Sequence, residues 1–143
     1  MLRQLLVGAA VTTSNIAIHA LVMMAVVNVA FTLSNRRFRR NVLMLPTVMI
    51  GTAMVLKGAH TCEVALWALA YWIVDAAPQG TDLFYFAFVN YTTLGYGDIV
   101  PAPEWRLLGP LTAATGILMF GWSTAVMFEV LRRAMPPASR SNH

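Results

Sequence analysis

Charged residues are scarce in this chain of 143 residues. Only 11% of them are Asp, Glu, Lys or Arg, and 58% are hydrophobic, whereas a soluble domain carries roughly a quarter charged residues. The mean hydropathy is +0.63. This composition leaves no room for a soluble domain and indicates a protein of the lipid bilayer.

Cysteine and regularly spaced arginine are also scarce. Cys62 is the single cysteine, so an intrachain disulfide is excluded. No segment carries arginine at every third position, which excludes a recognisable voltage sensor. Ten residues follow Arg133, and we therefore expect no attached regulatory domain.

Three long apolar runs are present, from Leu5 to Leu33, from Val42 to about Ala77 and from Trp105 to about Leu131. The first would extend roughly 43 Å as a helix, enough to cross a hydrocarbon core of about 30 Å, and it is too long for a signal peptide. Since two crossings within the second run would each be too short, we expect one long helix there. Its possible bends are Pro46, Gly51 and Gly58.

Arginines follow the first and third runs. "SNRRFRRN" supplies four, and Arg132 and Arg133 supply two more. The positive-inside rule places both groups in the cytoplasm and the N-terminus outside. The short segment "TDLFYFAFVNYTT", Thr81 to Thr93, must then enter and leave the membrane from the outer face. The net charge of +4 is explained by topology and anionic lipid, so no nucleic-acid partner is expected.

The stretch "NYTTLGYGDIVP", Asn90 to Pro101, would therefore be non-helical backbone at membrane depth. Such backbone is tolerated only where protein buries it or where it lines a water-filled cavity. Gly95 and Gly97 permit positive φ, which allows successive carbonyls to turn to one side. A ladder of carbonyl oxygens can replace the hydration shell of a hard cation.

"TTLGYGD", Thr92 to Asp98, resembles the selectivity filter of potassium channels. The helix-compatible "LFYFAFVNYT" before it, Pro101 after it and Gly116 in the third run follow the family's order. The resemblance covers about residues 81–133. It is closest in plan to bacterial channels with a single pore loop and two transmembrane helices, here with an extra N-terminal helix.

The resemblance implies a potassium-selective, passive channel and not an enzyme. It implies an all-α membrane protein with three transmembrane helices and a re-entrant pore helix. The chain would assemble as a homotetramer in a cell membrane, and for a bacterial channel this is the inner membrane. The permeant ion would be K+, with no organic cofactor. Its ligands would be the carbonyls of Thr93, Leu94, Gly95 and Tyr96 and the Thr93 hydroxyl, with Gly97 completing the filter.

Two positions near the filter depart from the family pattern. Leu94 stands where valine or isoleucine is usual, but the ligand there is a carbonyl, so we expect selectivity to persist. Val89 stands where many members have a glutamate that pairs with the filter aspartate. The Tyr85 hydroxyl is a candidate replacement donor to Asp98. Tyr85, Asp98 and Thr92 are expected to support the filter.

Further roles are expected around the pore, and those of the cavity-lining residues follow from the resemblance. Thr81 is expected to be the N-cap of the pore helix, with Asp82 in its first turn. Gly116 is a hinge or a packing position, and gating could be absent or depend on lipid, pH or the filter. Residues expected to line the cavity are Ile117, Phe120 and Thr124, and acidic residues expected at the outer mouth are Asp75, Asp82, Asp98 and Glu104.

One polar group lies outside the filter: His60, Cys62 and Glu63, with His19 in the first run. Its spacing fits no strong metal template, and we favour an interhelical hydrogen-bonded cluster. A pH-sensing role for His60 and Glu63 is an alternative. Alternatives for the whole chain are a nonconducting or regulatory membrane subunit, or a small intramembrane metal-binding protein.

The predicted segments are an N-terminal transmembrane helix at 1–34, a basic cytoplasmic loop at 35–41, a channel pore domain at 42–134 and a disordered tail at 135–143. Within the pore domain we expect an outer helix at 42–77, a pore helix at 81–92, the filter at 93–97 and an inner helix at 105–133.

Overall fold

The computed structural model describes residues 1–35 and 44–134, and the regular elements among these residues are all helices, with no strand. This confirms the all-α prediction for the described part of the chain. The elements are α1 (Leu2–Asn35), α2 (Met44–Ile73), α3 (Leu83–Tyr91), a short 3-10 helix η1 (Pro103–Trp105) and α4 (Leu108–Ala134).

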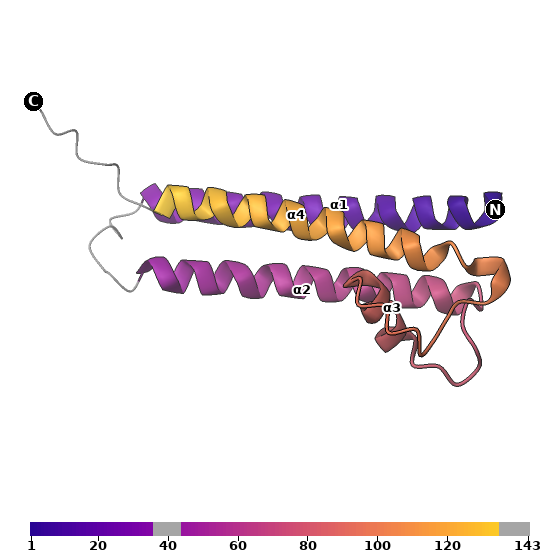
Figure 1. Ribbon diagram of the computed structural model, residues 1–143. Helices are drawn as coiled ribbons and strands as arrows, with labels where there is room; N and C mark the ends of the chain where they lie inside the picture. The colour runs from indigo at the N-terminus through magenta and orange to yellow at the C-terminus, as the bar shows by residue number, and fades with distance from the viewer. Residues whose placement is uncertain (36–43, 135–143) are drawn as a thin grey trace, which may run out of the picture.

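Three long helices form an elongated bundle, and the short α3 is attached near one end of it (Figure 1). α1 contacts both α2 and α4, and α3 packs against both α2 and α4. The N-terminus lies at the end of the bundle where α3 is found, and α4 finishes at the opposite end (Figure 1). The segment between α3 and η1 therefore lies in the half of the bundle that holds the N-terminus (Figure 1).

Two of the described helices are long and apolar enough to cross a membrane by length and composition, over Leu2–Val29 and Pro103–Arg133. α2 has 30 residues and would extend about 45 Å. It carries Lys57, His60 and Glu63 along its length. Intramembrane ionisable groups of this kind are costly unless they are paired.

The main buried cluster joins α2, α3 and α4 where the short helix docks. Trp67 and Tyr71 of α2 meet Phe86 and Tyr91 of α3, and Met119 contributes from α4. Each of these five side chains is at most 2% exposed. The aromatic core therefore fixes α3 against the long helices.

Polar contacts attach α1 to the rest of the bundle. The Gln4 side chain accepts a hydrogen bond from the Leu107 amide at 2.8 Å, and the hydroxyls of Thr12 and Thr115 lie 2.9 Å apart. Hydrogen bonds between helices hold bundles together where lipid offers no alternative partner. α1 is thus an integral part of this chain's fold.

Several element boundaries differ from those expected. α2 ends at Ile73 rather than 77, because Asp75 adopts a positive φ of 52°, which a helix cannot continue through. Pro46, Gly51 and Gly58 all lie inside one unbroken α-helix. Asn35 belongs to α1, and the rest of the expected basic loop, together with the tail at 135–143, lies outside the described residues.

The prediction that Thr81 caps the pore helix is wrong. Asp82 is the N-cap of α3, because its carboxylate accepts hydrogen bonds from the amides of Phe84 and Tyr85 at 3.1 and 3.0 Å. The Thr81 amide is used in a turn, bonded to the Pro78 carbonyl. α3 is therefore shorter than the expected 81–92.

The inner helix also begins later than the expected residue 105. Pro103–Trp105 form the separate 3-10 turn, in which the Trp105 amide bonds to the Ala102 carbonyl. α4 then starts at Leu108, with Pro110 in its first turn. Proline is tolerated there because the first amides of a helix have no intrahelical partner.

Candidate ion-conducting site

The backbone of the predicted filter alternates in handedness. φ is positive at Thr93 (62°), Gly95 (53°) and Gly97 (78°), but not at the intervening Leu94 and Tyr96. Alternation between left- and right-handed conformations turns successive amide N–H groups to one side of the chain. The carbonyls then face the opposite side, as a ladder of ligands requires.

The hydrogen bonds agree with amide groups on one side of this stretch and carbonyls on the other. The amides of Thr93 and Leu94 donate to carbonyls at the end of α3, those of Asn90 and Val89, at 3.0 Å each, and the Gly95 amide approaches Val89 at 3.4 Å. Among the described residues, no hydrogen bond to the carbonyls of residues 93–97 is present. Because backbone carbonyls need partners, this row of oxygens is available to an ion.

The same stretch is exposed on the single chain. Every residue from Thr93 to Asp98 is exposed, and Leu94 and Tyr96 reach 53% and 66%. Irregular backbone of this kind cannot face lipid. It must face either water or further protein.

The outer end of the filter is tied to the first turns of α3. The Tyr85 hydroxyl donates to Asp98 Oδ2 at 2.9 Å, the hydrogen bond that the sequence suggested. This bond raises the pKa of Tyr85, which keeps the hydroxyl protonated as a donor. The Thr92 hydroxyl bonds instead to the Phe88 carbonyl of α3 at 2.8 Å, so it supports the end of the helix.

Gly116 lies where α4 crosses the end of α3. A Cβ at this position would overlap the Tyr91 carbonyl group, lying 2.9 Å from its carbon atom. Tyr91 is the last residue of α3. The structure therefore gives Gly116 a packing role, and a hinge at this residue stays a prediction.

The residues expected to line the cavity share an open face of α4. Ile117 and Phe120 are 61% and 38% exposed, and Thr124 is exposed one turn further along. The Thr124 hydroxyl bonds within its own helix, to the Phe120 carbonyl at 2.9 Å. No other described part of the chain covers this face fully.

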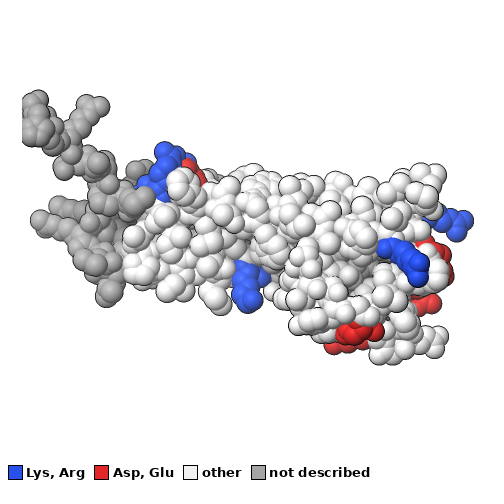
Figure 2. Space-filling model, in the orientation of Figure 1, with Lys and Arg blue, Asp and Glu red and all other residues white. Residues whose placement is uncertain are grey.

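Acidic residues are unevenly distributed along the bundle. Acidic side chains gather at the end that carries α3 and the filter (Figure 2). At the other end Glu129 is held by Arg132 at 2.8 and 2.9 Å and also contacts Arg133. Four acidic residues lie near the filter end. Asp75 follows α2, Asp82 caps α3, Asp98 follows the filter and Glu104 lies in η1.

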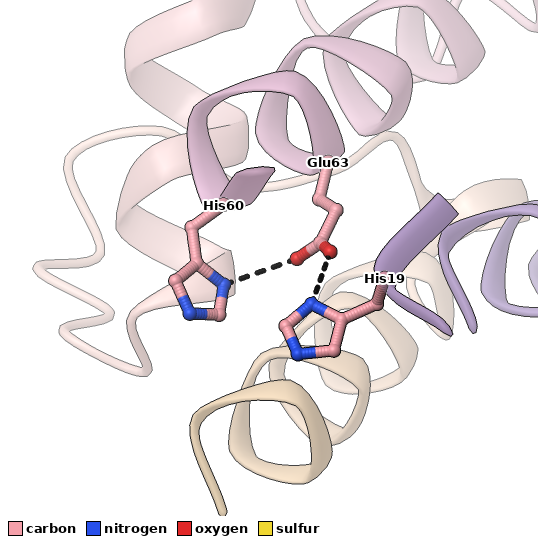
Figure 3. Close-up of side chains that lie close together, drawn as sticks. All are labelled: His19, His60 and Glu63. Atoms are coloured by element: carbon pink, nitrogen blue, oxygen red, sulfur yellow. Dashed lines mark hydrogen bonds and ion pairs between the residues drawn. The ribbon is translucent and has the colours of Figure 1, made fainter. Parts of the chain in front are cut away.

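The second candidate site is a buried polar cluster behind the filter. The rings of His19 (α1) and His60 (α2) both point at the Glu63 carboxylate (Figure 3). His19 Nδ1 lies 2.7 Å from Glu63 Oε1, and His60 Nδ1 lies 3.1 Å from Oε2. The interhelical hydrogen-bonded cluster expected from the sequence is therefore present, and pH sensing by it stays a prediction.

Two further residues complete this cluster, and sequence patterns did not assign them to it. The Tyr91 hydroxyl of α3 donates to Glu63 Oε2, and Ser123 Oγ of α4 lies 3.0 Å from His60 Nε2 and 3.3 Å from His19 Nε2. Cys62 is exposed, and it takes no part. Only the i, i+3 spacing of His60 and Glu63 was visible in the sequence.

A family model described as an ion channel matches residues 59–133, which include the filter, α3, α4 and half of α2. Comparison with curated proteins and with solved structures gives no match. The matched region is more than half of the chain, and the two apolar helices agree with a membrane location. The chain therefore belongs to the ion-channel family of two-transmembrane pores that is typical of potassium channels.

Proposed function

We propose that this protein conducts K+ passively and selectively across a membrane through residues 93–97. The observation that carries the proposal is the alternating φ along this stretch, with positive values at Thr93, Gly95 and Gly97. It leaves a row of carbonyls without hydrogen-bond partners on one side. K+ is the substrate of the pore, and main-chain oxygens replace its hydration shell.

The ligands in this proposal are the carbonyls of Thr93, Leu94, Gly95 and Tyr96, with the Thr93 hydroxyl at the inner end. Leu94 takes part through its main chain alone, so its side chain is free to differ from the family's usual valine. Gly95 and Gly97 have positive φ, a backbone conformation in which an L residue with a side chain is strained. These two glycines are therefore the positions least open to substitution.

Four copies of the chain complete the pore in this proposal. One chain supplies one row of oxygens, whereas a cation needs ligands on all sides. The exposed filter and the open face of α4 then line a central axis. Each chain contributes three transmembrane helices, α1, α2 and α4, and α3 dips into the outer half of the membrane.

The proposed orientation has the filter end outside and the end of α4 in the cytoplasm. Acidic side chains at the filter end (Figure 2) would concentrate cations at the mouth, and the arginines at the other end follow the positive-inside rule. In a Cys62→Ser background, a membrane-impermeant thiol reagent should label Gln79→Cys in intact cells and should leave Thr32→Cys unlabelled. The reverse pattern would invert the orientation.

The proposal is tested by reconstituting the purified chain in liposomes with a potassium gradient. We expect potassium flux that barium blocks, and we expect Gly95→Asp or Tyr96→Ala to reduce it to the level of empty liposomes. Leu94→Val is the matched control, since it keeps every carbonyl and should keep the flux. Equal sodium and potassium flux would refute selectivity, and flux that is absent or insensitive to the filter variants would refute the pore.

A further inference from the structure

The hydrogen bonds of the buried cluster cannot all form in its ordinary protonation state. Apart from the approach of His60 to Tyr91, five contacts join its side chains: Glu63 to His19, His60 and Tyr91, and Ser123 to each histidine. Each contact needs one proton. Two neutral imidazoles, two hydroxyls and an ionised carboxylate carry four protons between them.

One contact in the cluster therefore brings two lone pairs together. His60 Nδ1 also lies 3.0 Å from the Tyr91 hydroxyl, but that hydroxyl already donates its proton to Glu63. The site is buried, with the His19 and Glu63 side chains at 0% exposure. Two lone pairs that face each other and a carboxylate without a counter-charge both cost free energy when they are buried. One additional cation in the cluster would remove both costs.

We propose that this cluster binds a divalent transition metal of the zinc type, with His19 Nδ1, His60 Nδ1 and the Glu63 carboxylate as ligands. Two imidazoles and one carboxylate form a ligand set that zinc takes in proteins. The ion supplies the positive charge that the hydrogen-bond count leaves missing. It would bridge α1 to α2 behind the filter.

The distances suit such an ion after small shifts. Zinc bonds of 2.0–2.1 Å in a tetrahedral site place neighbouring ligand atoms about 3.4 Å apart. The candidate ligand atoms all lie within 4.8 Å of one another, and the two closest pairs are at 2.7 and 3.1 Å. To admit the ion, the 2.7 Å pair has to open by about 0.7 Å and the 3.1 Å pair by about 0.3 Å.

The surroundings also fit a metal site. Metal-binding histidines usually donate the other ring N–H to an oxygen that orients them. Here the Nε2 atoms of both histidines lie against one oxygen, Ser123 Oγ, which can accept from both and leave both Nδ1 lone pairs facing Glu63. The Tyr91 hydroxyl is placed to orient the carboxylate or to supply the fourth ligand.

His60 is the ligand nearest to the open face of α4 in exposure. The His60 side chain is 14% exposed, unlike the other two ligands. The Phe120 ring lies 4.7 Å from the His60 ring and is itself partly exposed. An ion in the proposed cavity would therefore reach His60 by displacing Phe120.

This inference goes beyond the proposed function, and its test measures binding rather than conduction. The full chain, without a histidine tag, is stripped with a chelator in detergent and titrated with Zn²⁺ by calorimetry. We expect one zinc ion per chain, and we expect His19→Gln and Glu63→Gln each to weaken binding by about tenfold or more. Cys62→Ser and His143→Gln remove the cysteine and the third histidine of the chain. Both variants should leave the affinity for zinc unchanged.

Two further measurements keep the test decisive if a ligand variant fails to fold. Ser123→Ala keeps all three ligands and should weaken zinc binding by about ten- to a hundredfold. Co²⁺ added to the unaltered chain should give the visible absorption of a four-coordinate site. The proposal is overturned if zinc does not bind in a one-to-one ratio, or if folded His19→Gln or Glu63→Gln binds zinc with unchanged affinity.

Discussion

At the residue scale, α4 passes very close to the end of α3 at Gly116. Its Cα faces the carbonyl of Tyr91, the residue that ends α3 and is separated from the filter by Thr92 alone. The neighbour is backbone rather than a flexible side chain, so it cannot move aside without moving the filter. The position has no room for a methyl group.

We expect Gly116→Ala to lower the free energy of unfolding by about 1 to 3 kcal/mol, because overpacking forces backbone shifts. Gly121→Ala is the matched control on the same helix, since nothing lies within 4 Å of a Cβ there, and it should be neutral or stabilising by about 0.5–1 kcal/mol. Unfolding of the two variants in mixed detergent measures the difference. Equal stabilities would show that α4 does not depend on this contact.

At the element scale, α3 depends on its surroundings. It has nine residues, whereas isolated helices shorter than about 12–15 residues are marginal. Its buried side chains, Phe86 and Tyr91 among them, pack into the aromatic core. Asp82 supplies the cap that satisfies two of its first amides.

Asp82→Ala should therefore destabilise the protein by about 1 kcal/mol, the usual effect of losing an N-cap. Asp82→Asn keeps an acceptor oxygen and should retain most of the stability. Thr81→Ala tests the assignment, because it should have little effect if Asp82 is the cap. A larger loss at Thr81 than at Asp82, in the same unfolding assay, would contradict the observed cap.

At the scale of the whole molecule, the single chain leaves its most irregular backbone uncovered. Residues 93–98 are exposed, as are Ile117 and Phe120 on the adjoining helix. In a bilayer, exposed polar backbone must be covered by protein or lie on water. Self-association around this face would cover the backbone with protein and leave it facing a water-filled axis.

Native mass spectrometry of the protein released from detergent should thus give a species of four chains, each of 15.7 kDa. The reason is geometric, since an axial cage of carbonyls needs several strands arranged symmetrically. Cross-linking in native membranes, before any detergent is added, is the control for dissociation. A monomer or dimer by both methods would exclude the proposed pore.

Local patterns in the sequence were sufficient for part of this structure. Low charge and long apolar runs indicated the membrane, and the glycine spacing indicated positive φ at Gly95 and Gly97, as observed. Positive φ at Thr93 was not anticipated, because residues other than glycine seldom adopt it. The Tyr85 to Asp98 bond could be suggested because both residues belong to one local motif.

The amino-acid sequence by itself determined the apolar segments, the short element between them and the filter motif, because each depends on neighbouring residues. Only the tertiary structure decided which polar side chains meet. His19 and Ser123 are 104 positions apart, and no periodicity relates them to Glu63 or Tyr91. Their contact depends on how α1, α2, α3 and α4 pack, and the same packing decides that Gly116 must be small.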